Sequence, residues 1–419
     1  MKTTSKYMEK TESLLFTPVE IGPVTLRNRT IRSAAFENMC PEHNPSQMLY
    51  DYHTSVARGG IGMTTVAYAS VSRSGLSFDN QLWMRREIVL PLRMLTDAIH
   101  AEGAKASIQL GHCGNMSHVA TAGQIPISAS TGFNLYSPTV VRGMSIDEIE
   151  RMAEKFGEAV CLAKESGFDC VEIHAGHGYL ISQFLSPYTN HRRDSFGGDL
   201  DNRMNFMRLC MEHVMKAANG EIAVVVKTNM RDGFKGGNEL EEGIVIAKEL
   251  ERLGVDGLVL SGGFVSKAPM YVMRGEMPIH TMTHYMTQWW LKYGVRAVGR
   301  CMIKSEPYKD LYFLEDALEV RKNVKLPLIY VGGCVSREGI ETVLNSGFEA
   351  VQMGRALINE PDFVNRMRDG EERCGCDHVN YCIARMYSKE MACHKHRCDL
   401  TEGIKREIAG IKRRNGLDG

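Results

Sequence analysis

Residues 169–199, DCVEIHAGHGYLISQFLSPYTNHRRDSFGGD, decide how the rest of the chain is organised. The opening DCVEIH alternates polar and apolar residues after the turn residue Gly167, which predicts a β-strand. Such a strand would bring His174, His177 and Tyr179 close together at its carboxyl end. Polar side chains gathered where a strand ends are typical of the active site in a barrel of alternating strands and helices.

The composition is that of an ordinary globular protein. Of the 419 residues, 43% are hydrophobic and 24% are charged, and 50 basic residues balance 50 acidic ones. The zero net charge gives no reason to expect nucleic acid or an anionic membrane as a partner. No apolar run reaches transmembrane length and the polar start lacks the apolar core of a secretory signal, so we expect a cytoplasmic protein. We therefore expect the 12 cysteines to be reduced thiols.

Eight strand candidates follow one another along the chain, with amphipathic helix patterns between most of them. Three times a helix closes on Gly and the next strand starts on an acidic residue, in GFDCVEI, GVDGLVL and GFEAVQM. Eight such units predict an α/β protein folded as a (β/α)8 TIM barrel. An open, doubly wound sheet would normally carry G-x-G-x-x-G after its first strand, and the sequence lacks that motif. The strand candidates are residues 28–35, 61–68, 104–110, 169–174, 221–230, 255–263, 326–333 and 349–355.

Two segments do not follow this alternation of strands and helices. Residues 264–310, between the sixth and seventh strands, form an overlong connection rich in Met, Tyr and Trp, which we expect to be a structureless lid or partner surface. Residues 371–419 form a short Cys/His-rich C-terminal extension whose basic tail we expect to be a solvated helix. We therefore divide the chain into a barrel at residues 1–370 and an extension at residues 371–419.

The last two strands end in residues suited to a phosphate. Gly332 and Gly333 end the seventh strand, and Gly354 and Arg355 end the eighth. In such barrels backbone N–H groups face the anion at these positions, glycine permits close approach, and Arg adds a bidentate partner. Glycines can simply end strands, but Arg355 in register favours phosphate. Sugar-phosphate lyases and flavin enzymes share such a site, so it does not choose the reaction.

Other polar residues end the strands in between. Gln109 and Lys227 end the third and fifth strands, where an amide can bond a heterocycle edge and a lysine can stabilise an anion, although both are equally well explained as polar rim residues. His174 and His177 form an H-x-x-H pair, which also occurs in zinc sites, but the sequence offers no evident third ligand and no H-E-x-x-H helix. With Tyr179 beside them, a carbonyl-polarising pair and a proton donor fit better.

Four segments together resemble the old yellow enzyme family of FMN-dependent oxidoreductases, in the branch of the 2,4-dienoyl-CoA reductase barrel. They are HAGHGYLISQFLSPYTNHRRDSFGG, LFTPVEIGPVTLRNRTIRSA, QLGHCG and VGGCVSREGIETVLNSGFEAVQMGRALINEPDF. The resemblance covers about residues 14–370. It implies a barrel that holds FMN at its carboxyl mouth and uses NADH or NADPH. It also implies reduction of an activated C=C next to a carbonyl, in a small apolar substrate.

The same resemblance assigns roles to individual residues. Backbone contacts to the flavin would come from Ser33, Ala34, Ala35, Phe36, and Ala67 or Tyr68. Gln109 would bond the pyrimidine edge, Lys227 would lie near N1 and O2, and the phosphate would be held by Gly332, Gly333, Gly354 and Arg355. His174 and His177 would bind the substrate carbonyl oxygen, flavin N5 would give hydride, and Tyr179 would give a proton.

The extension departs from the family pattern. In longer members of this family, a four-cysteine iron–sulfur motif follows the barrel. This chain keeps Cys376, Cys382 and Cys393, but Val379 occupies the remaining position, so we expect neither a [4Fe–4S] cluster nor another metal.

Three alternatives stay open from the sequence. One is a barrel subunit of an iron–sulfur flavoenzyme that is fed by a separate electron-transfer partner. Another is a flavin-free lyase or hydrolase that depends on a phosphate or on a metal held by His174 and His177. The third is a catalytically silent protein that binds a flavin or contacts a partner through residues 264–310. A homo-oligomer is compatible with all of them.

Overall fold

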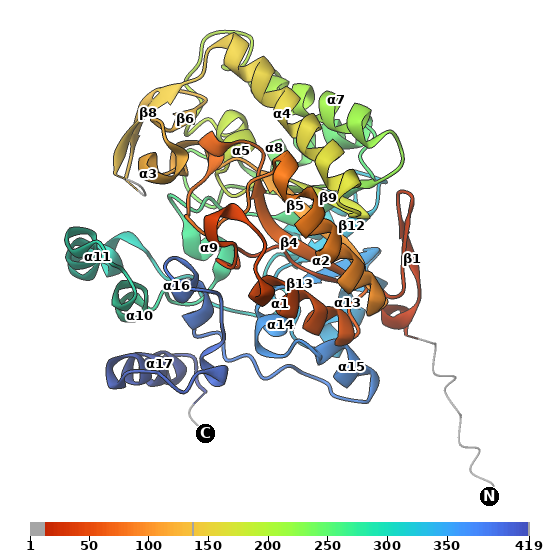
Figure 1. Cartoon of the computed structure of the whole chain (residues 1–419), viewed down its shortest axis with the longest axis vertical. Coiled ribbons are helices and arrows are strands. Elements are labelled where there is room, and N and C mark those ends of the chain that lie inside the picture. Colours follow the sequence, from red (N-terminus) through yellow and green to blue (C-terminus); the bar gives the residue numbers. More distant parts are fainter. Residues whose placement is uncertain (1–12, 136–137, 418–419) are drawn as a thin grey trace, which may run out of the picture.

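A closed barrel of eight parallel strands forms the centre of the molecule in the computed structural model, which describes residues 13–135 and 138–417 (Figure 1). The strands follow chain order around the barrel, and the last closes on the first. They are β3 (Thr30–Arg32), β4 (Met63–Ser70), β5 (Lys105–Gly111), β9 (Cys170–Ala175), β10 (Ala223–Asn229), β11 (Gly257–Ser261), β12 (Leu328–Val331) and β13 (Ala350–Met353). The predicted (β/α)8 TIM barrel is confirmed.

Helices cover the outside of the barrel and connect its strands. They are α1 (Gln47–Arg58), α2 (Val89–Ala101), α4 (Ile146–Glu165), α7 (Asn205–Ala218), α8 (Leu240–Arg252), α12 (Leu314–Arg321) and α13 (Arg337–Asn345). After β13 come the short α14 (Arg355–Asn359) and α15 (Phe363–Arg368). Helix α4 begins with a capping box, in which the Ser145 side chain accepts the Glu148 N–H and the Glu148 carboxylate accepts the Ser145 N–H.

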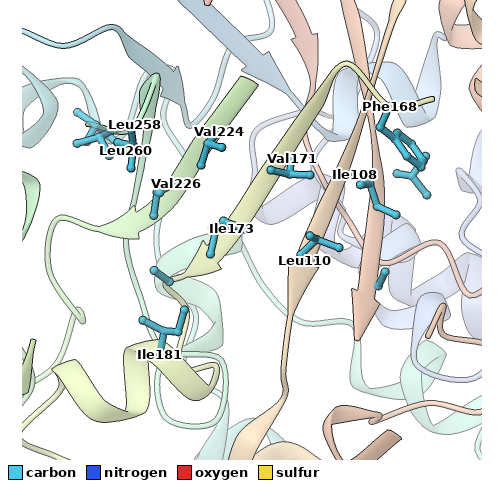
Figure 2. Packing of buried hydrophobic residues seen from close by; sticks show 14 of the residues in the cluster. Ile108, Leu110, Phe168, Val171, Ile173, Ile181, Val224, Val226, Leu258 and Leu260 are labelled. Carbon is cyan, nitrogen blue, oxygen red and sulfur yellow. The ribbon is translucent and has the colours of Figure 1, made fainter. Parts of the chain in front are cut away.

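The alternation in DCVEIH separates the two sides of β9. Val171 and Ile173 pack in the large cluster between strands and helices, together with residues of β5, β10 and β11 (Figure 2). Cys170 belongs to a second cluster inside the barrel, with one or two apolar residues from most other strands. Successive side chains on a strand point to opposite faces, so Glu172 and His174 also lie on the inner side. The hairpin of β1 (Val19–Ile21) and β2 (Val24–Leu26) closes the inner cluster at the amino end.

The acidic residues that start three strands tie neighbouring strands together at the amino end of the barrel. The Asp169 carboxylate accepts the Ala106 N–H of β5 at 2.8 Å, and the Asp256 carboxylate accepts the Val224 N–H of β10 at 2.7 Å. Glu349 accepts the Leu328 N–H of β12 at 2.6 Å. The repeated Gly–x–acidic pattern therefore has a structural cause: each carboxylate accepts an N–H from the first or second residue of an adjacent strand.

Residues 264–310 contain helices, so the expectation that they lack secondary structure is wrong, whereas their role as a lid or partner surface stays a prediction. They contain α9 (Pro269–Met273), α10 (Ile279–His284) and α11 (Trp289–Met302), which lie to one side of the barrel (Figure 1). The Met and aromatic residues of this connection partly serve as helix-packing groups, since Met270, Met277 and Ile279 are buried in the main core. A small sheet of β6 (Ile127–Ser128), β7 (Gly132–Asn134) and β8 (Thr139–Gly143), with α3 (Val119–Ala122), fills the connection before α4, and α5 (Leu180–Leu185) and α6 (Leu200–Arg203) follow β9.

The extension contains α16 (Tyr381–Met386), whose apolar residues join the main core, and α17 (Glu402–Arg414), which packs beside α10. Helix α17 confirms the predicted terminal helix, but it is not fully solvated, because Ile404, Ile408 and Ile411 are buried against Val379 and Tyr381. Residues 1–12 and 418–419 of the two predicted segments lie outside the described residues. Across the part of the chain that is described, no helix combines the length and apolarity needed to cross a bilayer.

Candidate active site

A cleft opens at the carboxyl ends of the barrel strands and contains about 840 Å³ of empty space, part of it open to solvent. Its walls come from the loops after β3, β12 and β13, from α9, and from the extension. Nine of the residues predicted from the sequence line it: Ser33, Ala34, Ala35, His177, Lys227, Gly332, Gly333, Gly354 and Arg355. The structure therefore brings together the ring and phosphate ends of the predicted site.

The three glycines at the phosphate end are not all required for the same reason. Gly332 and Gly333 have φ angles of +133° and +76°, and a Cβ on either would approach a protein atom to 2.9 or 2.7 Å. Packing and backbone conformation alone require them. A Cβ on Gly354 would meet nothing within 4 Å, so a side chain at this position would enter open space at the cleft.

Arg355 is half-buried beside the same space. Its guanidinium donates to Asn380 Oδ1 at 2.6 Å and lies 5.5 Å from the Tyr308 ring centroid. The extension therefore holds the side chain that we predicted to bind phosphate. An arginine fixed by one bond still has donors left for a second acceptor.

Glu172 links the predicted ring-binding residues and was missed by the sequence reasoning. Its carboxylate accepts Gln109 Nε2 at 2.6 Å and pairs with Lys227 Nζ at 2.7 Å, with all three side chains buried. Lys227 Nζ also lies 3.5 Å from Ser33 Oγ. Burial lowers the pKa of Lys227, while the Glu172 carboxylate acts in the opposite direction. The signal was available in DCVEIH, because Glu172 is two residues before His174 and shares its side of the strand.

Gln352 of β13 is a second cleft residue that the sequence reasoning missed. Its Nε2 donates to Glu172 at 2.5 Å, and the side chain lines the cleft. Its Oε1 is buried and has no hydrogen-bond partner among the described residues. A buried acceptor without a partner is costly in a folded protein, and a donor on a bound molecule would satisfy it.

The turn after β9 brings the two imidazoles and the phenol together. The His174 ring centroid lies 5.0 Å from that of His177 and 4.3 Å from that of Tyr179. His177 has a φ of +58°, its backbone N–H donates to Asn229 Oδ1, and its Nε2 lies 2.7 Å from Ser261 Oγ. A non-glycine residue in this conformation is held there by its surroundings, which is common at functional sites.

All three side chains are uncharged at neutral pH. Burial, with His177 and Lys227 nearby, holds the pKa of His174 well below its ordinary value, and burial with Lys227 lowers the pKa of His177 to about 3. Burial, with Cys113 nearby, raises the pKa of Tyr179 far above its ordinary value of 10. The group thus presents neutral imidazoles and a protonated phenol, which can donate hydrogen bonds and one proton.

The remaining predicted residues form an aromatic wall beside Tyr179. Phe36, Ala67 and Tyr68 pack with Cys113 and Met116, and partly buried neighbours include Tyr179 and Met386. The Tyr68 ring lies 5.2 Å from Tyr179, and its hydroxyl lies 2.5 Å from Cys113 Sγ. The Ala67 N–H donates to the buried Glu37 carboxylate, so that donor is already used by the protein.

Three cysteines of the extension line a smaller space of about 270 Å³, which Arg355 also borders. Cys376, Cys382 and Cys393 line it, and burial raises the pKa of Cys382 to about 12 and that of Cys393 to about 11. In residues 13–135 and 138–417, no three His, Cys, Asp or Glu side chains are arranged to hold a metal ion.

The chain is similar in sequence to a known protein family and to individual proteins of known activity. Residues 14–301 match the model of the NADH:flavin oxidoreductase / NADH oxidase family. The chain is 36% identical to the 4,4'-dithiodibutanoate disulfide reductase of Rhodococcus erythropolis, over 89% of this chain and 93% of that protein. It is 30% identical to the NADH oxidase of Thermoanaerobacter brockii over 88% of this chain and spans 52% of that protein's length.

Two solved structures share the fold. A 2-naphthoyl-CoA reductase in complex with 2-naphthoyl-CoA gives a TM-score of 0.78 at 22% identity, covering 94% of this chain and 58% of that one. An old yellow enzyme homologue from Zymomonas mobilis gives 0.68 at 23% identity, covering 86% of this chain and 94% of that one.

Proposed function

Because the chain belongs to the NADH:flavin oxidoreductase / NADH oxidase family and is an FMN-dependent NAD(P)H oxidoreductase, we propose that it reduces a carbon–carbon double bond conjugated to a carbonyl. The observation that carries this proposal is the convergence of His174, His177 and Tyr179 as three uncharged donors beside the cleft. Membership of this family does not agree with a flavin-free lyase or hydrolase.

The cleft fits FMN in its donors, acceptors and open space. Gln109, Lys227 and the backbone of residues 33–36 would hold the ring, and Gly354 with Arg355 would hold the phosphate. The unpartnered Gln352 Oε1 and the open space at Gly354 support this assignment. Once bound and reduced by NADH or NADPH, FMN would supply the hydride for the β-carbon of the substrate.

The three side chains after β9 then have separate tasks. The neutral imidazoles of His174 and His177 donate hydrogen bonds to the carbonyl oxygen, which draws electron density from the conjugated double bond. Tyr179 keeps its proton at neutral pH and transfers it to the α-carbon. One hydride and one proton are thereby added, and the product is the saturated carbonyl compound.

The experiment is a separate measurement of the two half-reactions by stopped flow. In Tyr179→Phe, reduction by NADPH should stay within twofold of wild type, whereas reoxidation by 2-cyclohexenone should slow by roughly 10²- to 10⁴-fold, the usual effect of losing a general acid. The matched control is Tyr293→Phe, which removes a hydroxyl from an exposed tyrosine of α11 and should change neither rate. Equal slowing of both half-reactions would remove Tyr179 from this role.

Reduction of a disulfide is the second candidate. It is favoured by the 36% identity to the Rhodococcus disulfide reductase over nearly the whole of both chains. The chemistry balances with the same groups, because hydride added to one sulfur gives a thiol and the other sulfur leaves as a thiolate. That thiolate would take its proton from water, because a thiol has a pKa of about 8.5 and Tyr179 is the weaker acid.

Competing acceptors distinguish the two reactions. Anaerobically reduced holoenzyme is mixed with 2-cyclohexenone in one experiment and with a symmetric dialkyl disulfide in the other, and flavin absorbance reports reoxidation. We expect the enone to reoxidise the protein faster. Reoxidation by the disulfide alone would overturn the first proposal in favour of the second.

A further inference from the structure

Helix α11 has a packed side and an exposed side, and both are apolar. Val295 and Ile303 pack against the main core, and Gly299 lies between them against Ile279 of α10. Positions four residues apart share one side of a helix, so these residues define the packed side. Large apolar side chains occupy the rest of the helix surface, and Trp289 and Trp290 are 72% and 53% exposed. The full set is Trp289, Trp290, Tyr293, Val298 and Met302.

The exposed side of α11 faces away from the rest of the protein. Figure 1 shows α11 at the outer edge of the molecule, beyond α10 and away from the barrel. A group of exposed apolar side chains on one surface of a protein marks a site of interaction with a protein or a membrane. We therefore asked which partner this side of α11 fits.

The charge of this segment has one sign, although the whole chain is neutral. Residues 277–305 contain no Asp or Glu, and their basic residues are Lys292, Arg296, Arg300 and Lys304. Glu276 and Glu306, which flank the segment, form ion pairs with other arginines. Among the described residues, no carboxylate forms an ion pair with any of the four bases. Burial, with basic side chains nearby, also lowers the pKa of His284. The positive charge of the segment is therefore not balanced within the protein.

Two of the bases lie on the same side of α11 as a tryptophan. Trp289, Arg296 and Arg300 are spaced at i, i+7 and i+11, which places them along one stripe of the helix, and all three are exposed. Arg296 Nε donates to Thr283 Oγ1 at 3.0 Å, and its guanidinium has further donors for an anion. Indole rings favour the headgroup level of a bilayer, and arginines beside them reach the lipid phosphates.

The charge argues against a second copy of this chain as the partner. A two-fold contact sets the same patch of both copies against itself, which would bring Arg296 and Arg300 of one copy close to those of the other. The partner is therefore anionic. An acidic protein would need an apolar patch of its own in register with its carboxylates, whereas an anionic bilayer offers phosphates and acyl chains at every point of its surface.

We propose that α11 binds the surface of a membrane that contains anionic lipids. Trp289 and Trp290 insert among the lipid headgroups, and Arg296 and Arg300 pair with the phosphates. The helix lies on the bilayer and does not cross it. The zero net charge of the chain gave no reason to expect such a partner, because it averages over this local excess of bases. The inference rests on residues outside the cleft and is independent of the reaction.

The test is sedimentation of the holoenzyme with vesicles. Vesicles of equal parts phosphatidylcholine and phosphatidylglycerol should bind the protein about 30-fold more tightly than vesicles of phosphatidylcholine alone. Molar salt should release it, because salt screens the attraction. Two of the three tryptophans of the chain lie in α11, so tryptophan emission should shift to shorter wavelength on binding.

Two double variants separate the contributions of charge and of apolar insertion. Arg296→Gln with Arg300→Gln should weaken binding about 30-fold, the effect of two basic residues near an anionic surface. Trp289→Ala with Trp290→Ala should weaken it at least about tenfold and abolish the emission shift. All four side chains are exposed, so circular dichroism and FMN content should match those of wild type.

The matched control is Arg151→Gln with Lys155→Gln. These bases are also exposed and four residues apart, but they lie on α4, and their removal changes the net charge equally. Binding by this variant should stay within twofold of wild type.

Three results would overturn the proposal. The first is a wild-type protein that sediments with neither kind of vesicle, and the second is equal binding by the arginine variant and the control. The third is binding to polyglutamate, or self-association that Trp289→Ala abolishes, in a protein that does not bind vesicles. It would assign this side of α11 to an acidic protein or to a second copy.

Discussion

Burial of the two imidazoles after β9 changes what they can do. Histidine ordinarily titrates near pH 6.5, but low-dielectric surroundings and the nearby Lys227 keep His174 and His177 neutral. A neutral imidazole donates one hydrogen bond, but it carries no imidazolium proton that it could give to a substrate at physiological pH. In the proposed mechanism the proton would therefore come from Tyr179, whose phenol stays protonated.

This charge state predicts the pH dependence of reoxidation. The pKa of His177 lies at about 3, below the range of the measurement, and that of His174 is lowered in the same direction. The rate constant for reoxidation by an enone should therefore be flat from pH 5 to pH 8 in anaerobic stopped flow. An inflection near pH 6.5 would mean that an imidazole of ordinary pKa participates, contrary to the structure.

The residues that the sequence could not predict are those whose role depends on contacts across the barrel. His174, His177 and Tyr179 lie within six positions of one another, so a strand and a turn suffice to bring them together. Glu172 and Gln352 are 180 positions apart, and their contact exists only once the barrel has closed. The sequence places each on a strand but does not show that they meet.

At the scale of the elements, the strands of the barrel are held in register by side chains as well as by their own ladders. Asp169, Asp256 and Glu349 each accept an N–H from the first or second residue of a neighbouring strand. The same acidic positions revealed the βα repeat in the sequence, because each follows a helix-ending Gly by two residues. The regular recurrence of strands and helices along the sequence was therefore enough to predict the barrel.

The helices of residues 264–310 were not predicted for a related reason. The segment has no regular alternation with strands to mark its helices. Its longest helix, α11, exposes large apolar residues such as Trp289 and Trp290, which blurs the contrast between a buried and a solvated face.

The hydrogen bonds between these carboxylates and the neighbouring strands give a prediction about stability. In Asp256→Ala, the Val224 N–H loses its acceptor, and the free energy of unfolding should fall by about 1 to 3 kcal/mol, the cost of an unsatisfied buried group. Urea denaturation measures the loss, and the FMN dissociation constant should not change. A variant with wild-type stability would show that the hydrogen bond from the Val224 N–H to Asp256 contributes nothing to closing the barrel.

At the scale of the whole molecule, barrel and extension share one hydrophobic core. Cys374, Cys382 and Met391 of the extension belong to the same cluster as the helices around the barrel. Asn38, beside the cleft loop, donates to the backbone oxygens of Met386 and Lys389. The extension is therefore part of the wall of the site.

Buried histidines in both parts predict acid sensitivity. Burial lowers the pKa of His112, His177 and His378 to about 3, from 6.5 in the unfolded chain. Below pH 6.5 the unfolded state binds more protons, so stability is complete above that pH and falls as pH decreases. Each histidine should remove about 2 kcal/mol between pH 6.5 and 5.

Urea unfolding at pH 7, 6 and 5 measures this loss. His112→Gln should reduce the slope of unfolding free energy against pH by about 1.4 kcal/mol per pH unit below pH 6, because one proton fewer is taken up. A midpoint that stays constant or rises at pH 5 would contradict the expected loss.

The carboxylate ties have a consequence for how such a chain can diverge. They fasten the strands at the end of the barrel that lies away from the cleft, using side chains that belong to the strands' own starting positions. Closure of the barrel therefore places few demands on the loops at the mouth. Substitutions and insertions in these loops can therefore accumulate over evolutionary time and change which electron acceptor the protein uses. The barrel that holds the flavin stays the same.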